Sequence, residues 1–173
     1  MDVDEAVTRL RAIRHFAPQP LADGDLHAIL DAGRHAGSSK NLQRWQFIVV
    51  RDRDRLRALA RVGSSAGHLA GGAMAIALVT PDPRAPDAPL SITWDLGRAA
   101  QNMMLVAWSH GVGSVPATVY DQALCRAILG YPPDQHCEYI LNFGYPIEQR
   151  LVERPPRTGG RSALAQIVRW EGW

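Results

Sequence analysis

Residues 25–50, DLHAILDAGRHAGSSKNLQRWQFIVV, place a helix, a polar loop and a buried strand in immediate succession, and this order decides the fold. Small and apolar residues recur there at helical spacing: Leu26, Ile29, Leu30 and Gly33. We therefore expect a helix over 25–36 with one apolar face, capped by Asp23 or Asp25. Residues 46–50 are mostly apolar and end in a β-branched run, which predicts a buried strand.

The alternation of helix and strand patterns continues on both sides of this stretch. Further helices are predicted over 2–11, from 52 to near 63, over 94–110 and over 121–130, with a helical turn over 162–168. Further strands are predicted over 73–79, 114–118 and 138–143. Residues 80–89 hold four prolines, so they are expected to form an irregular connection. This order predicts an α/β or α+β protein.

The composition narrows the class of protein. With 173 residues and 46% hydrophobic content, the chain is expected to form one domain, 1–173. A net charge of only +2 argues against a nucleic-acid-binding protein. Cys125 and Cys137 lie twelve positions apart, which is not a CxxC spacing, so we expect reduced thiols. The absence of a signal-like start and of a long apolar run predicts a cytoplasmic protein without membrane contact.

Two segments point to a second subunit. The predicted helix 94–110 is apolar nearly all round, so we expect it to be buried on most sides, in the core or at a subunit interface. The tail, 146–173, is rich in proline and arginine but ends with Trp170 and Trp173. Such a tail is too polar to form core, and we expect it to pack on a partner subunit.

Several familiar catalytic motifs are missing from the sequence. There is no GxGxxG, P-loop, HExxH or GxSxG pattern, and the six histidines are scattered. We interpret the histidines as surface or core residues, and the glycine-rich stretch GSSAGHLAGG, 63–72, as a flexible turn. The sequence therefore predicts no metal site and no catalytic acid, base or nucleophile.

Six motifs occur in a fixed order along the chain: RAIRHF at 11–16, AGSSKNLQRWQF at 36–47, AAQN at 99–102, GVGS at 111–114, GYP at 144–146 and GRSAL at 160–164. In order and spacing they resemble the motifs of the nitroreductase family, and the resemblance covers nearly the whole chain. It implies an α+β fold with a central, mostly antiparallel sheet flanked by helices. It also implies a homodimer with two FMN sites at the interface.

The resemblance implies roles for particular residues. Arg11 and Arg161 would hold the FMN phosphate, with Arg157 as a weaker candidate, because arginine presents several fixed donors to phosphate oxygens. Arg14 would lie at the pyrimidine edge of the flavin, where a cation stabilises the charge that develops on reduction. The ribityl hydroxyls and the polar rim of the ring would be bound by Ser38, Ser39, Asn41 and Gln43. The ring itself would lie along Pro116, Ala117 and Thr118, with a backbone N–H near flavin N5.

The implied reaction transfers two electrons from NADH or NADPH through flavin N5 to a small-molecule acceptor such as a nitroaromatic or a quinone. Three positions depart from the family pattern: Ala12 replaces a serine, and Gly37 and Arg44 each replace a proline. The short 80–89 connection leaves little to cover the substrate side of the flavin. Alternatives are therefore other flavin chemistry on the same fold, such as flavin cleavage or reductive dehalogenation, and a non-catalytic or flavin-free binding protein.

Overall fold

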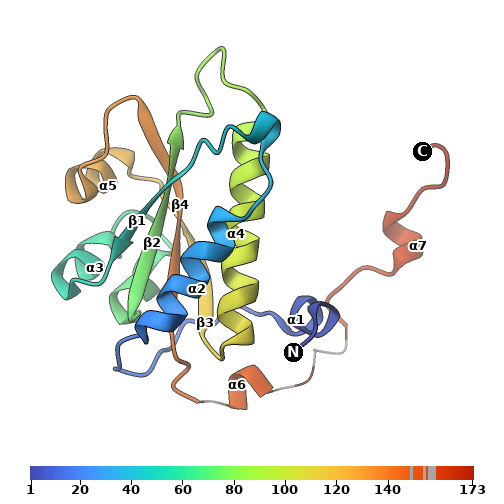
Figure 1. The fold of residues 1–173 in the computed structure, drawn as a ribbon, viewed down its shortest axis with the longest axis horizontal. Helices are drawn as coiled ribbons and strands as arrows, with labels where there is room; N and C mark the ends of the chain where they lie inside the picture. Colours follow the sequence, from blue (N-terminus) through green and yellow to red (C-terminus); the bar gives the residue numbers. More distant parts are fainter. Residues whose placement is uncertain (149, 154, 156–158) are drawn as a thin grey trace.

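The computed structural model describes residues 1–148, 150–153, 155 and 159–173. Its centre is a four-stranded sheet in the order β1-β2-β4-β3, with every neighbouring pair antiparallel. The strands are β1 (Gln46–Val50), β2 (Met74–Pro81), β3 (Gly113–Thr118) and β4 (Gln135–Gly144). Helices cover both faces of the sheet (Figure 1), so the predicted α+β class is confirmed.

The helices form one layer on each face of the sheet (Figure 1). One layer consists of α2 (Asp23–Arg34) and α4 (Ser91–Ser109), and the other of α3 (Arg53–Leu59), α5 (Gln122–Leu129) and the 3₁₀ helix η2 (Ala66–Gly71). The remaining short helices are α1 (Val3–Arg9), η1 (Ser39–Asn41), α6 (Arg150–Glu153) and α7 (Leu164–Ile167).

Strand β2 explains why the core has two halves. Its residues alternate between the two faces: Met74, Ile76 and Leu78 pack towards α2 and α4, while Ala75, Ala77 and Val79 pack towards α3 and α5. Both faces are covered, so the strand is a continuous apolar run rather than an alternating one. All six side chains are buried.

Aspartates cap two of the helices, whereas the aspartate cap predicted for a third is absent. Asp52 and Asp121 each accept a backbone N–H at the start of α3 and α5, at 2.8 Å, as expected of N-cap residues. Helix α2 instead begins at Asp23 after Ala22, without a side-chain cap. The Asp23 carboxylate pairs with Arg51 at 3.1 Å, and Asp25 contacts His110 at 2.8 Å, so both are engaged in tertiary contacts.

The glycine-rich stretch 63–72 is an ordered 3₁₀ helix over most of its length, so the predicted flexible turn is wrong. Ala66 and Leu69, three residues apart, are both fully buried and anchor η2 to the core. Glycines on either side of η2 let it lie close to the sheet. A Cβ on Gly63 would meet the carbonyl of Thr118, and a Cβ on Gly72 would meet the side chain of Asn142.

Helix α4 is less completely buried than predicted. One stripe packs into the core, but Trp94, Gly97, Arg98 and Gln101 are exposed in the isolated chain. Whether a second subunit covers the exposed side of α4, as the sequence allows, stays a prediction. The tail turn is also shorter than the predicted 162–168, since α7 spans Leu164–Ile167 and has Ala163 at its N-cap.

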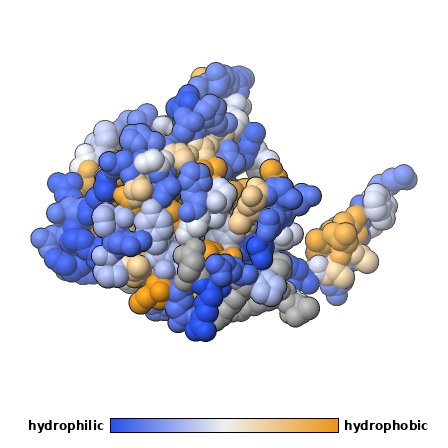
Figure 2. Space-filling view, turned by 60° about the horizontal axis from the view of Figure 1, so that its bottom comes forward, coloured by the Kyte–Doolittle hydropathy of each residue, from blue (hydrophilic) through white to orange (hydrophobic). Residues whose placement is uncertain are grey.

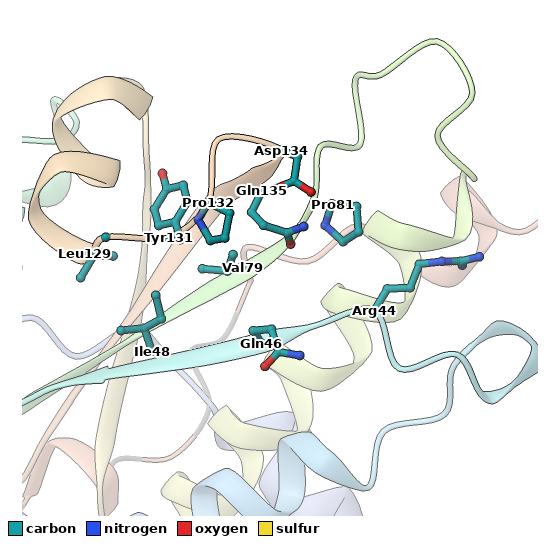
Figure 3. Close-up of a pocket in the computed structure, with 11 residues that line it drawn as sticks. Arg44, Gln46, Ile48, Val79, Pro81, Leu129, Tyr131, Pro132, Asp134 and Gln135 are labelled. Atoms are coloured by element: carbon teal, nitrogen blue, oxygen red, sulfur yellow. The ribbon is translucent and has the colours of Figure 1, made fainter.

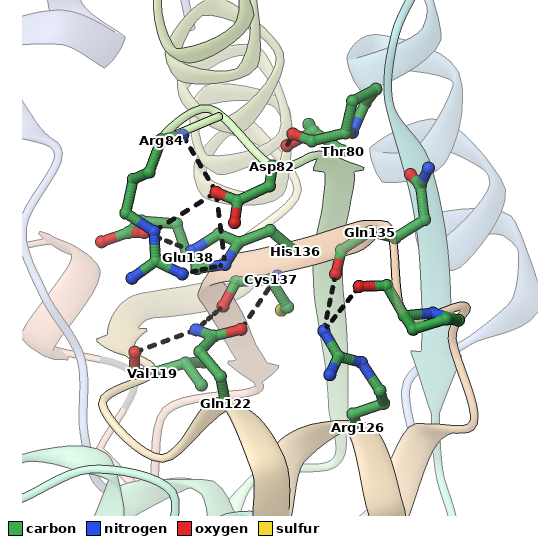
Figure 4. Close-up of polar contacts among 12 residues, drawn as sticks. Thr80, Asp82, Arg84, Val119, Gln122, Arg126, Gln135, His136, Cys137 and Glu138 are labelled. Carbon is green, nitrogen blue, oxygen red and sulfur yellow. Dashed lines mark hydrogen bonds and ion pairs between the residues drawn. The ribbon is translucent and has the colours of Figure 1, made fainter. Parts of the chain in front are cut away.

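Polar side chains fasten α5 and the 80–89 connection to β4 (Figure 4). Buried His136 contacts Glu138 at 2.6 Å and Arg84 at 2.9 Å, which ties the connection to the strand. Gln122 of α5 donates to the carbonyls of Val119 and Cys137, at 3.2 and 2.7 Å. This packing brings the two cysteines together. The neighbouring Cys125 thiol and burial raise the pKa of Cys137, so it stays a neutral thiol.

The C-terminal segment stands away from the rest of the chain. Figure 2 shows its apolar part apart from the body, and Leu164, Ile167, Trp170 and Trp173 are all exposed. Several large apolar side chains left exposed on one short segment are typical of an interaction segment. Among the described residues, no helix combines the length and apolar character needed to cross a membrane.

Candidate functional site

Four arginines from opposite ends of the chain line one cavity of about 450 Å³: Arg9, Arg11, Arg14 and Arg161. Arg11 and Arg14 come from the segment after α1, and Arg161 comes from the tail. Gly159 and Gly160 also line the cavity, both at positive φ of 82 and 81°. These φ values favour glycine and leave the backbone of this turn accessible to a ligand. Arg157, the weaker phosphate candidate, lies outside the described residues.

Arg11 is held in place by backbone from both ends of the chain. Its Nε donates to the carbonyl of Arg9 at 3.1 Å, and its Nη2 donates to the carbonyl of Pro155 at 3.2 Å. Its guanidinium also lies 5.9 Å from the centre of the Trp108 ring, a cation–π distance. The guanidinium is therefore fixed before any ligand arrives.

The segment that carries these arginines runs beside the free edge of β3. Ala12 bridges Ser114 in parallel, and the N–H of Ile13 donates to the carbonyl of Ser114 at 3.0 Å. Gly113 makes this approach possible, since a Cβ there would lie 2.7 Å from Cβ of Ile13. The cavity and the predicted flavin strand are thereby joined in one region.

Beyond Ser114, the backbone of β3 offers polar groups at its outer edge. The backbone N–H of Val119 donates to the carbonyl of Glu138 in β4, whereas that of Tyr120 donates to the carbonyl of Val62 on the other side. The backbone N–H and C=O groups of the even-numbered residues therefore point away from β4. Pro116 is one of these, and its missing N–H explains why proline fits this edge strand. The carbonyl of Pro116 and the N–H and carbonyl of Thr118 therefore face outwards, and a Cβ on Gly63 would lie 2.3 Å from that Thr118 carbonyl.

His68 of η2 lies at this edge and was not predicted as a site residue. It is half-buried, and its imidazole meets the carbonyl of Pro116 and lies within electrostatic reach of Arg14. Burial, followed by the Arg14 charge, lowers the pKa of His68 below its ordinary value, and the Pro116 carbonyl opposes the shift. A histidine flanked only by small and apolar residues, in AGHLAG, was the available signal.

The polar loop 37–43 forms a separate, strained cluster. Lys40, Asn41 and Gln43 have φ values of 52, 54 and 46°, a left-handed conformation that is unusual outside glycine and is found at functional sites. The hydroxyl of Ser38 accepts from the backbone N–H of Gln43 at 3.1 Å. The Gln43 amide donates to the side-chain oxygen of Asn41, also at 3.1 Å.

Helix α4 anchors this loop through a buried carboxylate. Asp95, which is 6% exposed, accepts the backbone N–H of Ser39 at 2.9 Å. Gly37 is also fitted to the helix, because a Cβ there would lie 2.2 Å from a guanidinium nitrogen of Arg98. The replacement of the family's proline by Gly37 therefore accompanies a specific contact with α4.

The polar loop and the arginine cavity lie at opposite ends of α4 (Figure 1). The loop is bound at Asp95 and Arg11 stacks near Trp108. Thirteen residues of α-helix separate the two, which corresponds to a distance on the order of 20 Å. One chain thus brings Arg11, Arg14 and Arg161 together beside Pro116–Thr118, but it leaves Ser38, Ser39, Asn41 and Gln43 apart from them.

A second cavity, of about 500 Å³, lies between β1 and the α5–β4 connection (Figure 3). Its floor is apolar, with Ile48, Val79 and Tyr131, and Arg44 and Asp134 stand at its rim. None of the site residues predicted from the sequence lines this cavity. Among the described residues, no group of three or more His, Cys, Asp or Glu side chains is placed to bind a metal ion.

Comparisons with known proteins agree on one family. The model of the Nitroreductase family matches residues 7–66 and 63–145. A protein of Archaeoglobus fulgidus, provisionally named an NADH dehydrogenase/NAD(P)H nitroreductase, is 32% identical over 146 residues, covering 81% of this chain and 83% of its own. The NADPH-flavin oxidoreductase of Vibrio harveyi is 26% identical, covering 86% of this chain and 68% of its own.

The fold also has close counterparts among solved structures. An FMN-dependent nitroreductase from Clostridium difficile superposes with a TM-score of 0.83 at 23% identity, over 99% of this chain and all of its own. Identity at this level shows a shared fold.

Proposed function

Since the chain belongs to the nitroreductase family, we propose that it is an FMN-dependent NAD(P)H oxidoreductase whose two flavin sites form between the subunits of a homodimer. One observation carries the proposal: four arginines from opposite ends of the chain line one cavity beside the outer edge of β3. The names of its relatives support the cofactor and the co-substrate, since they include an NADPH-flavin oxidoreductase and an FMN-dependent nitroreductase.

The donor set fits FMN. Arg11 and Arg161 supply guanidinium donors for a terminal phosphate, and Gly159 and Gly160 leave the backbone beside them accessible. The outer edge of β3 supplies backbone groups at Thr118 for the ring. When bound, FMN supplies the two-electron chemistry, while the protein supplies binding, orientation and electrostatics.

Arg14 is the residue that tunes the reaction in this proposal. It lines the arginine cavity near the Pro116 end of β3, so its charge favours the reduced, more negative form of the flavin pyrimidine. No side chain is proposed as a catalytic acid, base or nucleophile.

A second copy of the chain supplies the other half of the site. The loop residues Ser38, Ser39, Asn41 and Gln43 are about 20 Å from the arginine cavity along α4, so a partner must bring its own loop there. The exposed side of α4, including Trp94, and the apolar tail supply surfaces for this association. We place the tail, 146–173, on the partner subunit.

The proposal extends to the acceptor and the setting. A nitroaromatic or a quinone fits a site whose substrate side is open, as the short 80–89 connection suggests, although flavin cleavage and reductive dehalogenation would use the same flavin. The two unbridged cysteines fit a reducing cytoplasm.

The first experiment is the absorption spectrum of the purified protein. We expect a yellow protein that releases FMN, and not FAD, on denaturation, because the arginine cavity suits one terminal phosphate. A colourless protein that fails to bind added FMN would overturn the proposal.

The second experiment tests whether the site is shared between subunits. Arg161→Ala disables the arginine cavity of a chain, and Asn41→Ala disables its polar loop. If each site takes its arginines from one chain and its loop from the other, mixing the two variants by subunit exchange restores about one site in four. A site built within one chain gives no restoration, and an FMN titration separates the two cases.

A further inference from the structure

His68 contacts two neighbouring strands: the Asn142 side chain of β4 and the backbone of Pro116 in β3. The Asn142 amide of β4, fully buried, donates from Nδ2 to the backbone carbonyl of His68 at 2.7 Å. The same Nδ2 lies 3.2 Å from Nδ1 of the His68 ring. On its other side, the imidazole meets the carbonyl of Pro116.

These contacts fix one form of the ring. An amide N–H donates, so Nδ1 of His68 must be the acceptor and the ring proton must lie on Nε2. The Asn142 amide cannot be reversed, because its oxygen would then face the carbonyl of His68 at 2.7 Å. A proton on Nε2 is then available to the Pro116 carbonyl, and a second proton on Nδ1 would oppose the Asn142 amide.

The charged groups around η2 also disfavour a protonated ring. Arg14 lies on the cavity side. From the α3 side, Arg53 donates to the carbonyls of Ala70 and Gly72. Of these, Arg14 is the cation within electrostatic reach of the ring, and a positive charge on His68 would be unfavourable beside it.

We propose that His68 is a positioning residue of the flavin site: as a neutral ring clamped by Asn142, it holds the Pro116 carbonyl and so fixes the backbone edge that faces the flavin. The inference rests on the proposed function for its ligand, although the clamp itself is a property of the chain alone. Because the ring is neutral, Arg14 stays the cation that acts on the flavin at this end of the cavity.

The ring form is tested directly by nitrogen NMR of the uniformly ¹⁵N-labelled full-length protein, with and without FMN. We expect one histidine, identified by its loss in His68→Gln, to show a proton on Nε2 and to be less protonated at pH 6.5 than an ordinary histidine, which is half protonated there. A proton on Nδ1, or a doubly protonated ring at that pH, would overturn the clamp.

The positioning role is tested with two substitutions and a control. His68→Gln keeps a donor near the position of Nε2, His68→Leu removes it, and His27→Gln changes an exposed histidine. We expect His68→Leu to weaken FMN binding by about tenfold, the size of one neutral hydrogen bond, and His68→Gln to recover most of the loss. Thermal unfolding of each variant confirms that it is folded.

The outcomes separate this proposal from the one on which it rests. Two results would show that the role of His68 is wrong while the flavin site stands. In one, His68→Leu binds FMN as well as the unchanged protein; in the other, His68→Gln and His68→Leu lose the same FMN affinity. If the unchanged protein binds no FMN, the proposed function is wrong, and the role of His68 at a flavin fails with it.

Discussion

The arginine cavity depends on guanidinium groups that the chain brings from residues 11–14 and from residue 161. Arg11 is fixed by two carbonyls and by Trp108. Arg161 lies on the other side of the cavity, next to two glycines in left-handed conformation. A phosphate between them would neutralise charge at both ends of the chain, so FMN should order the tail as well as bind to it.

We expect Arg161→Ala to weaken FMN binding at least tenfold, since a charge-assisted hydrogen bond contributes about 1.5–3 kcal/mol. Arg169→Ala is the matched control, because Arg169 contacts carbonyls of its own turn and the Trp173 ring. Fluorescence titration with FMN measures both. Equal losses would mean that the tail arginines act only through their general charge.

A second single-residue prediction concerns the clamp at Asn142. In Gly72→Ala the new Cβ would lie 1.8 Å from Oδ1 of Asn142, a fully buried side chain, so Asn142 must move. Overpacking of this kind costs about 1–3 kcal/mol of unfolding free energy. Gly71→Ala is the control, since no atom lies within 4 Å of its Cβ. Urea unfolding compares them, and equal stability of the two variants would contradict the packing at Gly72.

At this scale the sequence predicted the arginines but not His68. Arg11, Arg14 and Arg161 belong to motifs whose residue types already suit phosphate, and the structure places them around one cavity. The role of His68 depends on Asn142, which is 74 residues away, and on the carbonyl of Pro116. No local pattern in AGHLAG could indicate either partner.

Among the elements, the loop 37–43 and helix α4 act as one unit. Three residues of the loop hold left-handed φ values, each of which costs free energy, so the anchor at Asp95 must offset part of that cost. The helices and strands that the sequence predicted were placed to within a few residues, whereas η1, η2 and α6 were not predicted. Helix η2 was missed because Ala66 and Leu69 are buried by tertiary packing, which outweighs the local preference of the glycines.

The anchor gives a prediction. Asp95→Ala leaves the backbone N–H of Ser39 without its acceptor, which costs about 1–3 kcal/mol and should let the strained loop relax. Asp95→Asn keeps an oxygen that can accept this N–H, so it should retain most of the stability. Chemical unfolding ranks the two variants. A stability for Asp95→Ala equal to that of the unchanged protein would show that the loop holds its shape without α4.

A second prediction concerns the acid sensitivity of the contact between α2 and the end of β4. Hydrogen bonds from Tyr145 and then His110 lower the pKa of Asp25. The carboxylate therefore stabilises the fold above the ordinary pKa of an aspartate, and this contribution is lost as the pH falls through the lowered value. Tyr145→Phe removes the larger cause, so it should destabilise the protein more at pH 7 than at pH 2. An equal loss at both pH values, measured by urea unfolding, would contradict this linkage.

For the whole molecule, the proposed flavin site makes association of two chains part of function, since one chain keeps the polar loop and the arginine cavity apart. The sequence could indicate a partner through the tail and α4, but the distance along α4 that separates the loop from the arginine cavity is visible only in three dimensions (Figure 1). How two chains are placed against each other depends on their folded surfaces, so the sequence pattern of one chain could not predict it.

Removal of residues 147–173 tests this arrangement. Without the tail, Arg161 and its apolar continuation are lost together, so we expect a protein that aggregates or carries no FMN. Light scattering and the flavin spectrum measure the two results. A stable, flavin-loaded monomer after truncation would contradict the shared site.

Lys40 is the only lysine of the chain, and it is exposed in the strained loop that a partner is proposed to receive. Amine-selective chemistry at a pH that spares other groups would therefore modify this loop and the N-terminal amine alone. Reductive methylation with ¹³C-formaldehyde would give one side-chain resonance, from Lys40, beside the resonance of the N-terminal amine. The Lys40 resonance would report on the loop during assembly and ligand binding without any engineered substitution.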